Sequence, residues 1–205
     1  MVHRAIRSIT KSKRRPKAAS KRSNAVEVLV SGGIDSAALL AFYVRRRFNV
    51  QALFVDFGQP AAKQELFAAR AVCKHYGVRL SIMSVKSQAV FSVGEIAGRN
   101  AFLVLAAILV CGTQPGMIAI GIHEGSPYYD CSEGFLKGIQ TVIDGYAAGK
   151  IRVVAPFLNW SKQTIWEFCK KVGVPVDSTY SCEKGGVRPC GRCLSCKDRE
   201  ALSVL

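Results

Sequence analysis

The sequence predicts an α/β protein with a Rossmann-like parallel sheet of five strands and helices on both faces of that sheet. Short apolar runs rich in β-branched residues alternate along the chain with longer segments of helical periodicity, and glycines or prolines separate many of them. That alternation is typical of a parallel sheet wrapped by helices. With 205 residues, of which 49% are hydrophobic, the chain is long enough to bury one core of good size.

The first half of the chain is predicted to run strand, helix, strand, helix, strand. The first strand (26–30) is an apolar run that ends in a glycine turn, and the helix after it (36–48) has apolar side chains three and four residues apart. The second strand (50–57) is again largely apolar. The next helix (60–76) opens with a proline, which suits a first turn, and stops at a glycine. A third strand covers residues 79–85.

The second half repeats this order after a stretch of weak signal. A very apolar segment (101–111) predicts a buried helix, and a strand follows at 117–122. A polar loop leads to a helix over residues 132–148 and a fifth strand over 151–155. The last predicted helix (161–172) begins at a serine, which can cap it, and is stopped by a glycine and a proline.

The formal net charge of +15 is concentrated at the N-terminus. Residues 1–25 contain nine Lys or Arg and no acid, which leaves 20 basic and 14 acidic residues, a balance of +6, for the remainder. We therefore divide the chain into a basic, flexible tail (1–25), an α/β domain (26–178) and a cysteine-rich C-terminal segment (179–205). The tail is open to three interpretations: a solvated extension, an arm that binds phosphates or a macromolecular partner, and an organelle transit peptide, which its lack of an apolar face disfavours.

The composition argues against a membrane protein or a secreted protein. The most apolar stretch, residues 101–110, is about half as long as a bilayer span requires. Eight cysteines would suggest disulfides in a secreted chain, but the sequence has no signal-peptide pattern and four of the cysteines fall within fifteen residues. We expect a soluble, cytoplasmic protein with no membrane partner.

The turn after the first strand, in VLVSGGIDSAALLAFY, has the features of a phosphate-binding loop. Backbone N–H groups freed by two glycines can curl around phosphate oxygens, and the N-terminus of the next helix adds partial positive charge. The turn is neither a G-x-x-x-x-G-K-[ST] loop nor a G-x-G-x-x-G loop. A plain strand-to-helix turn is the alternative. The place of the turn favours a ligand site, because open parallel sheets bind ligands at the carboxyl ends of their strands.

This turn is similar to the SGGxDS signature of the adenine-nucleotide α-hydrolase, or ATP pyrophosphatase, superfamily. Members of that superfamily cleave ATP to AMP and pyrophosphate, with the loop at the pyrophosphate end. The resemblance implies that ATP binds to the signature residues Ser31, Gly32, Gly33, Ile34, Asp35 and Ser36. A carboxylate is not itself a ligand for phosphate, so we expect Asp35 to hold Mg²⁺ or to order the loop.

Four cysteines near the C-terminus, in SCEKGGVRPCGRCLSC, have the spacing of a metal site. The ligands Cys182, Cys190, Cys193 and Cys196 are separated by seven, two and two residues. Tetrahedral zinc takes four thiolates, and two-residue gaps allow backbone turns to bring the sulfurs together. An iron–sulfur site and disulfides are the alternatives. Four cysteines leave no open coordination position, so we expect a structural Zn²⁺.

Together the two motifs resemble the 7-cyano-7-deazaguanine synthase family over residues 26–202. Shorter matches support it: FGQ at 57–59, GRN at 98–100, DC at 130–131, SK at 161–162 and the cysteine-containing end. Enzymes of that family activate the carboxylate of 7-carboxy-7-deazaguanine with ATP, convert it with ammonia to the amide, and use a second ATP to form the nitrile. The resemblance therefore implies a C–N ligase with ATP, Mg²⁺ and Zn²⁺ as cofactors, acting as a homodimer.

The resemblance also implies roles for individual residues. Asp35, Ser36 and Lys162 are the catalytic candidates, and Asp56 and Gln59 are expected to join the signature loop in binding ATP. The candidates for contact with the deazapurine are Arg99, Asn100, His123, Asp130 and Cys131.

Three other functions compete with this interpretation. A divergent relative would transfer the activated deazapurine to an amine of a protein or nucleic acid instead of ammonia. An ATP-dependent RNA-modifying enzyme would need a reactive cysteine pair and a larger RNA-binding domain, and neither is evident in the sequence. A zinc-ribbon nucleic-acid-binding module would bind through the basic tail in a salt-sensitive manner and would be indifferent to ATP.

Overall fold

A computed structural model describes residues 24–86, 88–91, 94–114 and 116–203. Its parallel five-stranded sheet confirms the predicted α/β fold class, with strand order β3-β2-β1-β4-β5. The strands are β1 (Ala25–Leu29), β2 (Asn49–Asp56), β3 (Leu80–Ser84), β4 (Gly116–Ala119) and β5 (Ile151–Val154). Almost all of the predicted basic tail lies outside the described residues.

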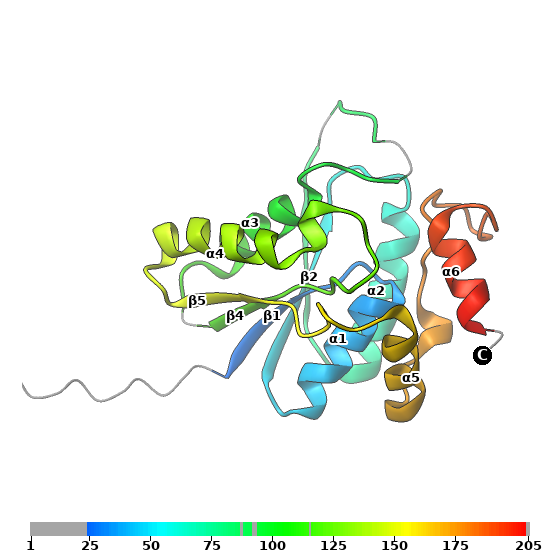
Figure 1. Ribbon diagram of the computed structural model, residues 1–205, viewed down its shortest axis with the longest axis horizontal. Helices are drawn as coiled ribbons and strands as arrows, with labels where there is room; N and C mark the ends of the chain where they lie inside the picture. The colour runs from blue at the N-terminus through cyan, green and yellow to red at the C-terminus, as the bar shows by residue number, and fades with distance from the viewer. Residues whose placement is uncertain (1–23, 87, 92–93, 115, 204–205) are drawn as a thin grey trace, which may run out of the picture.

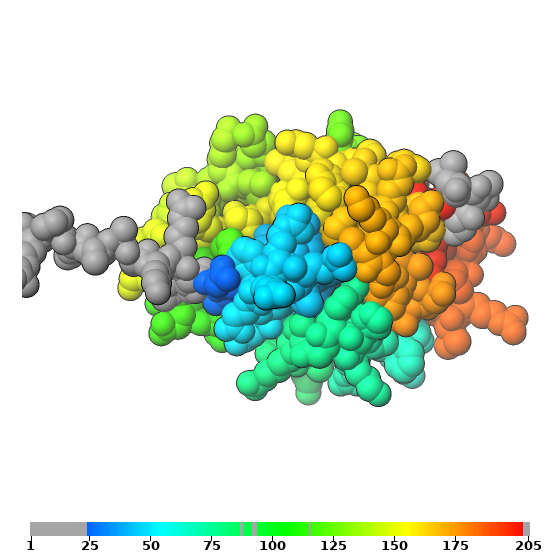
Figure 2. Space-filling view, turned by 90° about the horizontal axis from the view of Figure 1, so that it is seen from below, coloured from blue at the N-terminus to red at the C-terminus, as the bar shows by residue number. Residues whose placement is uncertain are grey.

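Helices cover both faces of the sheet (Figure 1). On one face lie α1 (Ile34–Arg45), α2 (Ala62–Tyr76) and α5 (Lys162–Val172), and on the other lie α3 (Arg99–Cys111) and α4 (Glu133–Ala147). Figure 2 looks onto the first of these faces, where α1, α2 and α5 are blue, blue-green and orange. A hydrophobic core lies on each face of the sheet, and the side chains of β1 alternate between the two. Val26 and Val28 pack toward α1 and α2, whereas Leu29 packs with α3 and α4.

Helix α1 begins two residues earlier than the sequence pattern predicts. Gly33, in an extended conformation, precedes its first residue, so Asp35 and Ser36 lie inside the first turn. The helix also ends at Arg45, before the predicted residue 48, because Arg47 adopts a left-handed conformation with φ of 59°. Helices α4 and α5 match their predictions closely, and each has a serine N-cap whose hydroxyl accepts a backbone hydrogen bond.

Residues 101–111 form a helix as predicted, but the helix is buried on one side only. Only one side of α3 packs against the sheet, with Val104, Ala106 and Ala107 in the core. Near its end Leu109 is 77% exposed and Val110 is 43% exposed. Nearly all residues of the segment are apolar, so the sequence has no helical alternation of polar and apolar residues that would predict which side is exposed.

The C-terminal part contains two elements that the sequence analysis did not predict, the short 3₁₀ helix η2 (Val176–Ser178) and the helix α6 (Leu194–Ser203). A second 3₁₀ turn, η1 (Tyr129–Cys131), interrupts the loop before α4. Arg199 of α6 donates hydrogen bonds to the carbonyl oxygens of Thr179 and Val176, which ties α6 to η2. Helix α6 lies at one end of the molecule (Figure 1). Among the described residues, no helix is both long and apolar enough to cross a bilayer.

Candidate functional site

A cavity of about 560 Å³ opens at the carboxyl edge of the sheet. Its walls come from the ends of β1, β2 and β4, the first turns of α1, α3 and α5, and the segment from Tyr180 to α6. Most of the candidate residues line it: Ser31, Gly33, Ile34, Asp35, Ser36, Gln59, Arg99, Asn100, His123, Cys131 and Lys162. Three do not, namely Gly32, Asp56 and Asp130.

The two glycines of the turn have different structural roles. Gly32 has φ of +78°, and a Cβ there would collide with the backbone oxygen of Glu65 and lie 3.0 Å from the backbone nitrogen of Ala69. Helix α2 therefore packs directly on Gly32. Gly33 has an ordinary extended conformation, and a Cβ there would lie 3.5 Å from Ser31 Oγ. Among the described residues, no packing contact requires a glycine at position 33, so the space next to its backbone is open to a ligand.

The two serines of the turn also differ. Ser36 is buried, and its Oγ donates to the Gly33 carbonyl at 3.0 Å and accepts from the Ser31 N–H at 3.2 Å. Its hydroxyl thus holds the turn in shape. Ser31 is exposed, with its Oγ 3.4 Å from Ser36 Oγ. The exposed Ser31 side chain can therefore contact a ligand in the cavity, whereas the buried Ser36 side chain stabilises the turn.

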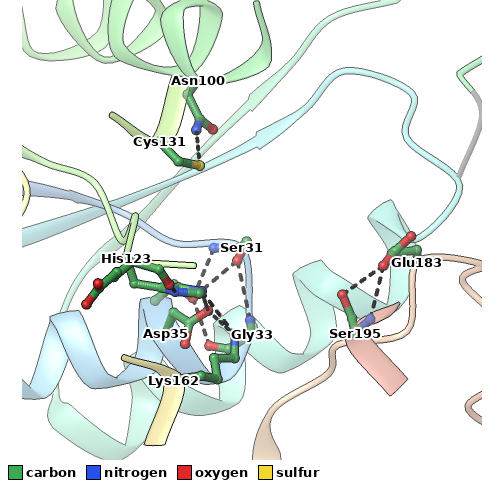
Figure 3. Close-up of polar contacts among 11 residues, drawn as sticks. Ser31, Gly33, Asp35, Asn100, His123, Cys131, Lys162, Glu183 and Ser195 are labelled. Carbon is green, nitrogen blue, oxygen red and sulfur yellow. Dashed lines mark hydrogen bonds and ion pairs between the residues drawn. The ribbon is translucent and has the colours of Figure 1, made fainter. Parts of the chain in front are cut away.

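Asp35 lies at the centre of a charged cluster with Lys162 and His123 (Figure 3). Lys162 Nζ donates to Asp35 Oδ2 at 2.6 Å and lies 3.5 Å from His123 Nε2. His123 Nδ1 is 2.6 Å from the Glu124 carbonyl, to which it donates, so Nε2 is the acceptor that faces Lys162 in the neutral ring. Asp35 Oδ1 is buried without a hydrogen-bond partner among the described residues. This orphaned oxygen fits a site for a divalent cation.

Asp56 and Gln59 are tied into the loop after β2. Asp56 Oδ1 accepts from the Gly58 N–H at 3.0 Å. Gln59 accepts from the Phe57 N–H at 3.0 Å and donates to Glu65 Oε2 at 2.9 Å. Glu65 lines the cavity, and burial raises the pKa of its carboxyl. Asp56 and Gln59 therefore shape the wall, and Glu65 is a cavity carboxyl that the sequence analysis missed.

Arg99, Asn100, Asp130 and Cys131 form a second group at the start of α3. Figure 3 shows the contact between Asn100 and Cys131. Asp130 Oδ2 accepts from the Asn100 backbone N–H at 3.2 Å, and the Asp130 carbonyl accepts from Asn100 Nδ2 at 3.0 Å. Asp130 thus caps α3 from thirty residues away and does not line the cavity. Burial raises the pKa of Cys131, which keeps it a thiol at neutral pH.

The chain end contributes cavity residues that the sequence analysis did not assign: Tyr180, Ser181, Glu183, Ser195, Asp198 and Arg199. Glu183 Oε1 accepts from the backbone N–H and the hydroxyl of Ser195 at the start of α6. The Tyr180 N–H donates to the Gly32 carbonyl at 2.9 Å. A Cβ at Gly185 would collide with the backbone of Pro60. The segment after α5 therefore packs directly on the glycine turn. The similarity of residues 181–199 to the C-terminal end of the family was the feature of the sequence that could have pointed to this part of the cavity wall.

The four candidate metal ligands converge as predicted. The sulfurs of Cys182, Cys190, Cys193 and Cys196 all lie within 4.8 Å of one another. One tetrahedral ion with Zn–S bonds of about 2.3 Å requires sulfur–sulfur separations of roughly 3.8 Å. A [4Fe–4S] cluster would separate the sulfurs further, because each cysteine binds a different iron. The donor set therefore fits a single soft ion such as zinc.

Backbone N–H groups support these thiolates. Cys190 Sγ accepts from the N–H groups of Arg192 and Cys193, both at 3.4 Å, and Cys182 Sγ accepts from the Cys190 N–H at 3.3 Å. The hydrogen bonds from Arg192 and Cys193 lower the pKa of Cys190 to about 6. Elsewhere, burial raises the pKa of Cys73 to about 11 and that of Cys169 to about 12, as expected for small hydrophobic core residues.

Comparison with known proteins identifies the family. The family described as "Queuosine biosynthesis protein QueC" matches residues 24–94 and 87–203. The chain belongs to the QueC family. It is 33% identical over 211 residues to the 7-cyano-7-deazaguanine synthase of Aquifex aeolicus, covering 88% of this chain and 96% of the relative. The corresponding synthase of Persephonella marina is 31% identical, with 87% and 92% covered.

Solved structures agree on the fold. The NMN synthetase of Francisella tularensis superposes with a TM-score of 0.52 at 14% identity, over 89% of this chain and 78% of that one. At this identity the similarity speaks for the α/β architecture alone. Family and fold both agree with the resemblance drawn from the SGGxDS turn and the cysteine spacing.

Proposed function

We propose that this QueC family member is a 7-cyano-7-deazaguanine synthase. It adenylates the carboxylate of 7-carboxy-7-deazaguanine with ATP and, with ammonia, forms first the amide and then the nitrile. The observation that carries the proposal is the turn of residues 31–36, which opens beside the Asp35–Lys162 pair into the cavity of about 560 Å³. Family membership supplies the substrate class.

The turn and its neighbours suit the triphosphate of ATP. The N–H groups at the start of α1 and the exposed Ser31 hydroxyl provide donors, and Gly33 leaves room for a phosphate to approach the backbone. In the protein without ligand, Lys162 is neutralised by Asp35. Asp35 would hold Mg²⁺, which would supply positive charge to the phosphates, and Lys162 would then be free to pair with a phosphate. The Lys162 ammonium is thus a counterion for the departing pyrophosphate.

The chemistry requires activation of a poor electrophile. A carboxylate oxygen of the substrate attacks the α-phosphorus of ATP, and the bond to the β-phosphate oxygen breaks, so pyrophosphate leaves. Ammonia then attacks the acyl carbon and AMP leaves. Adenylation of the amide oxygen by a second ATP, followed by loss of AMP and two amide protons, gives the nitrile. Each well-placed donor to the developing charge contributes about 3 kcal/mol.

The apolar part of the cavity wall suits a flat bicyclic base. Phe57, Leu103 and Ile122 provide apolar walls, and Arg99 and Glu65 provide charged groups. A mostly apolar site with a few fixed polar groups is typical of small-molecule binding. We propose that Arg99 pairs with the substrate carboxylate, since a guanidinium matches it with two parallel donors.

The test is product analysis. Purified full-length protein is incubated with ATP, Mg²⁺, 7-carboxy-7-deazaguanine and ammonium, and AMP, pyrophosphate and the deazapurine mass are followed. The proposal expects two AMP for each nitrile formed. AMP with amide but no nitrile would reduce the function to the first half-reaction, and no AMP with this substrate would exclude it.

Two companion proposals concern metal and assembly. We propose that the cysteine site holds a structural Zn²⁺, because four thiolates leave no open coordination position. We also propose that the protein works as a homodimer. Metal analysis of the purified protein tests the first proposal, and light scattering during size-exclusion chromatography tests the second.

A further inference from the structure

Glu27 is a carboxyl in the middle of the central strand β1, yet its side chain is only 6% exposed. The alternation of the strand places it on the same face as Leu29, toward α3 and α4. Its Oε1 is buried without a hydrogen-bond partner among the described residues. A buried carboxyl oxygen without a partner costs free energy that an apolar residue at this position would not, and a ligand that pairs with it would offset that cost.

Glu27 lines a second cavity, of about 300 Å³, at the amino edge of the sheet. The first residues of four strands contribute to it: Ala25, Asn49, Gly116 and Ile151. The site proposed for ATP lies at the carboxyl edge, at the other end of the same strands. This second cavity is therefore separate from the candidate active site, and its occupancy does not depend on the proposed function.

The walls of this cavity favour a positive charge. Of the described residues that line it, Glu27 is the one charged side chain, and Cys111 is the other titratable group. Cys111 is the last residue of α3, where backbone carbonyls end the helix with a partial negative charge. The side-chain amides of Gln51 and Gln114 add further acceptors. Burial raises the pKa of Glu27 to about 7, and a bound cation would lower it by favouring the ionised carboxylate.

We propose that this second cavity binds an organic cation, an alkylammonium or guanidinium group, whose charge pairs with Glu27. A volume of about 300 Å³ is at the lower end of small-molecule sites and exceeds what a bare metal ion would fill. A guanidinium presents several donors in one plane, which can serve the carboxylate and the helix carbonyls together.

Two sources can supply such a group. One is a free polyamine or arginine-like metabolite. The other is the chain itself, because Ala25 forms part of the cavity wall and the residues before it carry nine Lys or Arg and no acid. A residue adds at most about 3.5 Å of reach, so several of these side chains can return to a cavity next to Ala25.

Carboxyl NMR of full-length protein tests the proposal. Glutamate is labelled with ¹³C at Cδ, the Glu27 signal is assigned by its loss in Glu27→Gln, and its titration is followed with and without agmatine, a probe with a guanidinium and an ammonium end. The same titrations are run on a matched chain in which all nine Lys and Arg of residues 1–25 are replaced by Gln. Glu200, exposed on α6, serves as the internal control signal.

Each outcome decides a point. If agmatine lowers the Glu27 pKa from near 7 toward the ordinary range of about 4, the cavity binds a free cation. If Glu27 already titrates near about 4 in the native chain and rises in the neutralised chain, the basic segment supplies the cation. A Glu27 titration that is equal in both chains and unmoved by agmatine would overturn the proposal, and so would an agmatine response shared by Glu200.

Discussion

The glycine turn and the cysteine segment touch each other, but they owe their shapes to different interactions. The turn of residues 31–36 joins a central strand to a buried helix, and Ile34 belongs to the main core. The four cysteines form a small cluster of their own, packed with Tyr180. The Tyr180 N–H and Gly185 dock that segment on the turn and on Pro60. The sheet therefore preforms the turn, whereas we expect the segment that covers it to depend on the proposed zinc ion.

The comparison predicts that loss of the metal is the most damaging change. Cys193→Ser removes one of four thiolates, and because the segment has little core of its own, we expect loss of bound zinc and a fall in stability of several kcal/mol. Metal analysis and thermal melting measure both. Cys73→Ala is the matched control, since it removes a buried thiol that lies in the main core, outside the cluster of four cysteines, and should keep the zinc. Unchanged metal content and melting in Cys193→Ser would contradict the assignment.

A change inside the turn should act on chemistry and leave the fold intact. Asp35→Asn keeps the shape of the side chain but removes the charge that pairs with Lys162. We expect the rate of AMP formation to fall about 10²- to 10³-fold, as for loss of one preorganised electrostatic contact. The melting temperature should hardly move, because the pair is partly exposed. Glu200→Gln is the control, and equal rates for both variants would refute the role of Asp35.

A substitution at Gly32 tests whether the turn is held in place by its packing against α2. Gly32→Ala places a methyl group against the backbone of α2 at a position with φ of +78°. We expect a loss of about 2–4 kcal/mol in the free energy of unfolding, measured by denaturant titration. A variant as stable as the native protein would show that the turn can move away from α2.

The smallest effect is expected at Cys131. Burial raises the pKa of this thiol, and its sulfur accepts from Asn100 Nδ2 at 3.9 Å. We therefore expect Cys131 to line the cavity and not to act as a nucleophile. Cys131→Ala should keep the rate of AMP formation within about threefold of the native value, which is below the effect of losing a catalytic group. A hundredfold loss in the same assay would make Cys131 a participant in the reaction.

Local patterns predicted what depends on local interactions. Strands, helix stops such as Gly77 and Gly173, and the SGGxDS turn all follow from short stretches of sequence. The start of α1 was misplaced because its N-cap is a glycine, which offers no side-chain signal.

Contacts between residues far apart in the sequence could not be predicted from local patterns. The capping of α3 by Asp130 joins residues thirty positions apart, and α6 is fixed through Arg199 to residues some twenty positions away. Glu27 passed unnoticed because a single acid in an apolar run is ordinary in sequence. Its burial without a partner is apparent only in the folded chain.

The most direct test of the account is ATP binding to Gly33→Ala. The conformation of Gly33 suits alanine, and a Cβ has ordinary contacts there, so the variant should melt like the native protein. If the turn holds the triphosphate, the added methyl group occupies the approach to the backbone, and calorimetry should show affinity for ATP with Mg²⁺ reduced at least about tenfold, or 1.4 kcal/mol. Native ATP affinity in a fully folded Gly33→Ala protein would contradict the claim that this turn binds the nucleotide.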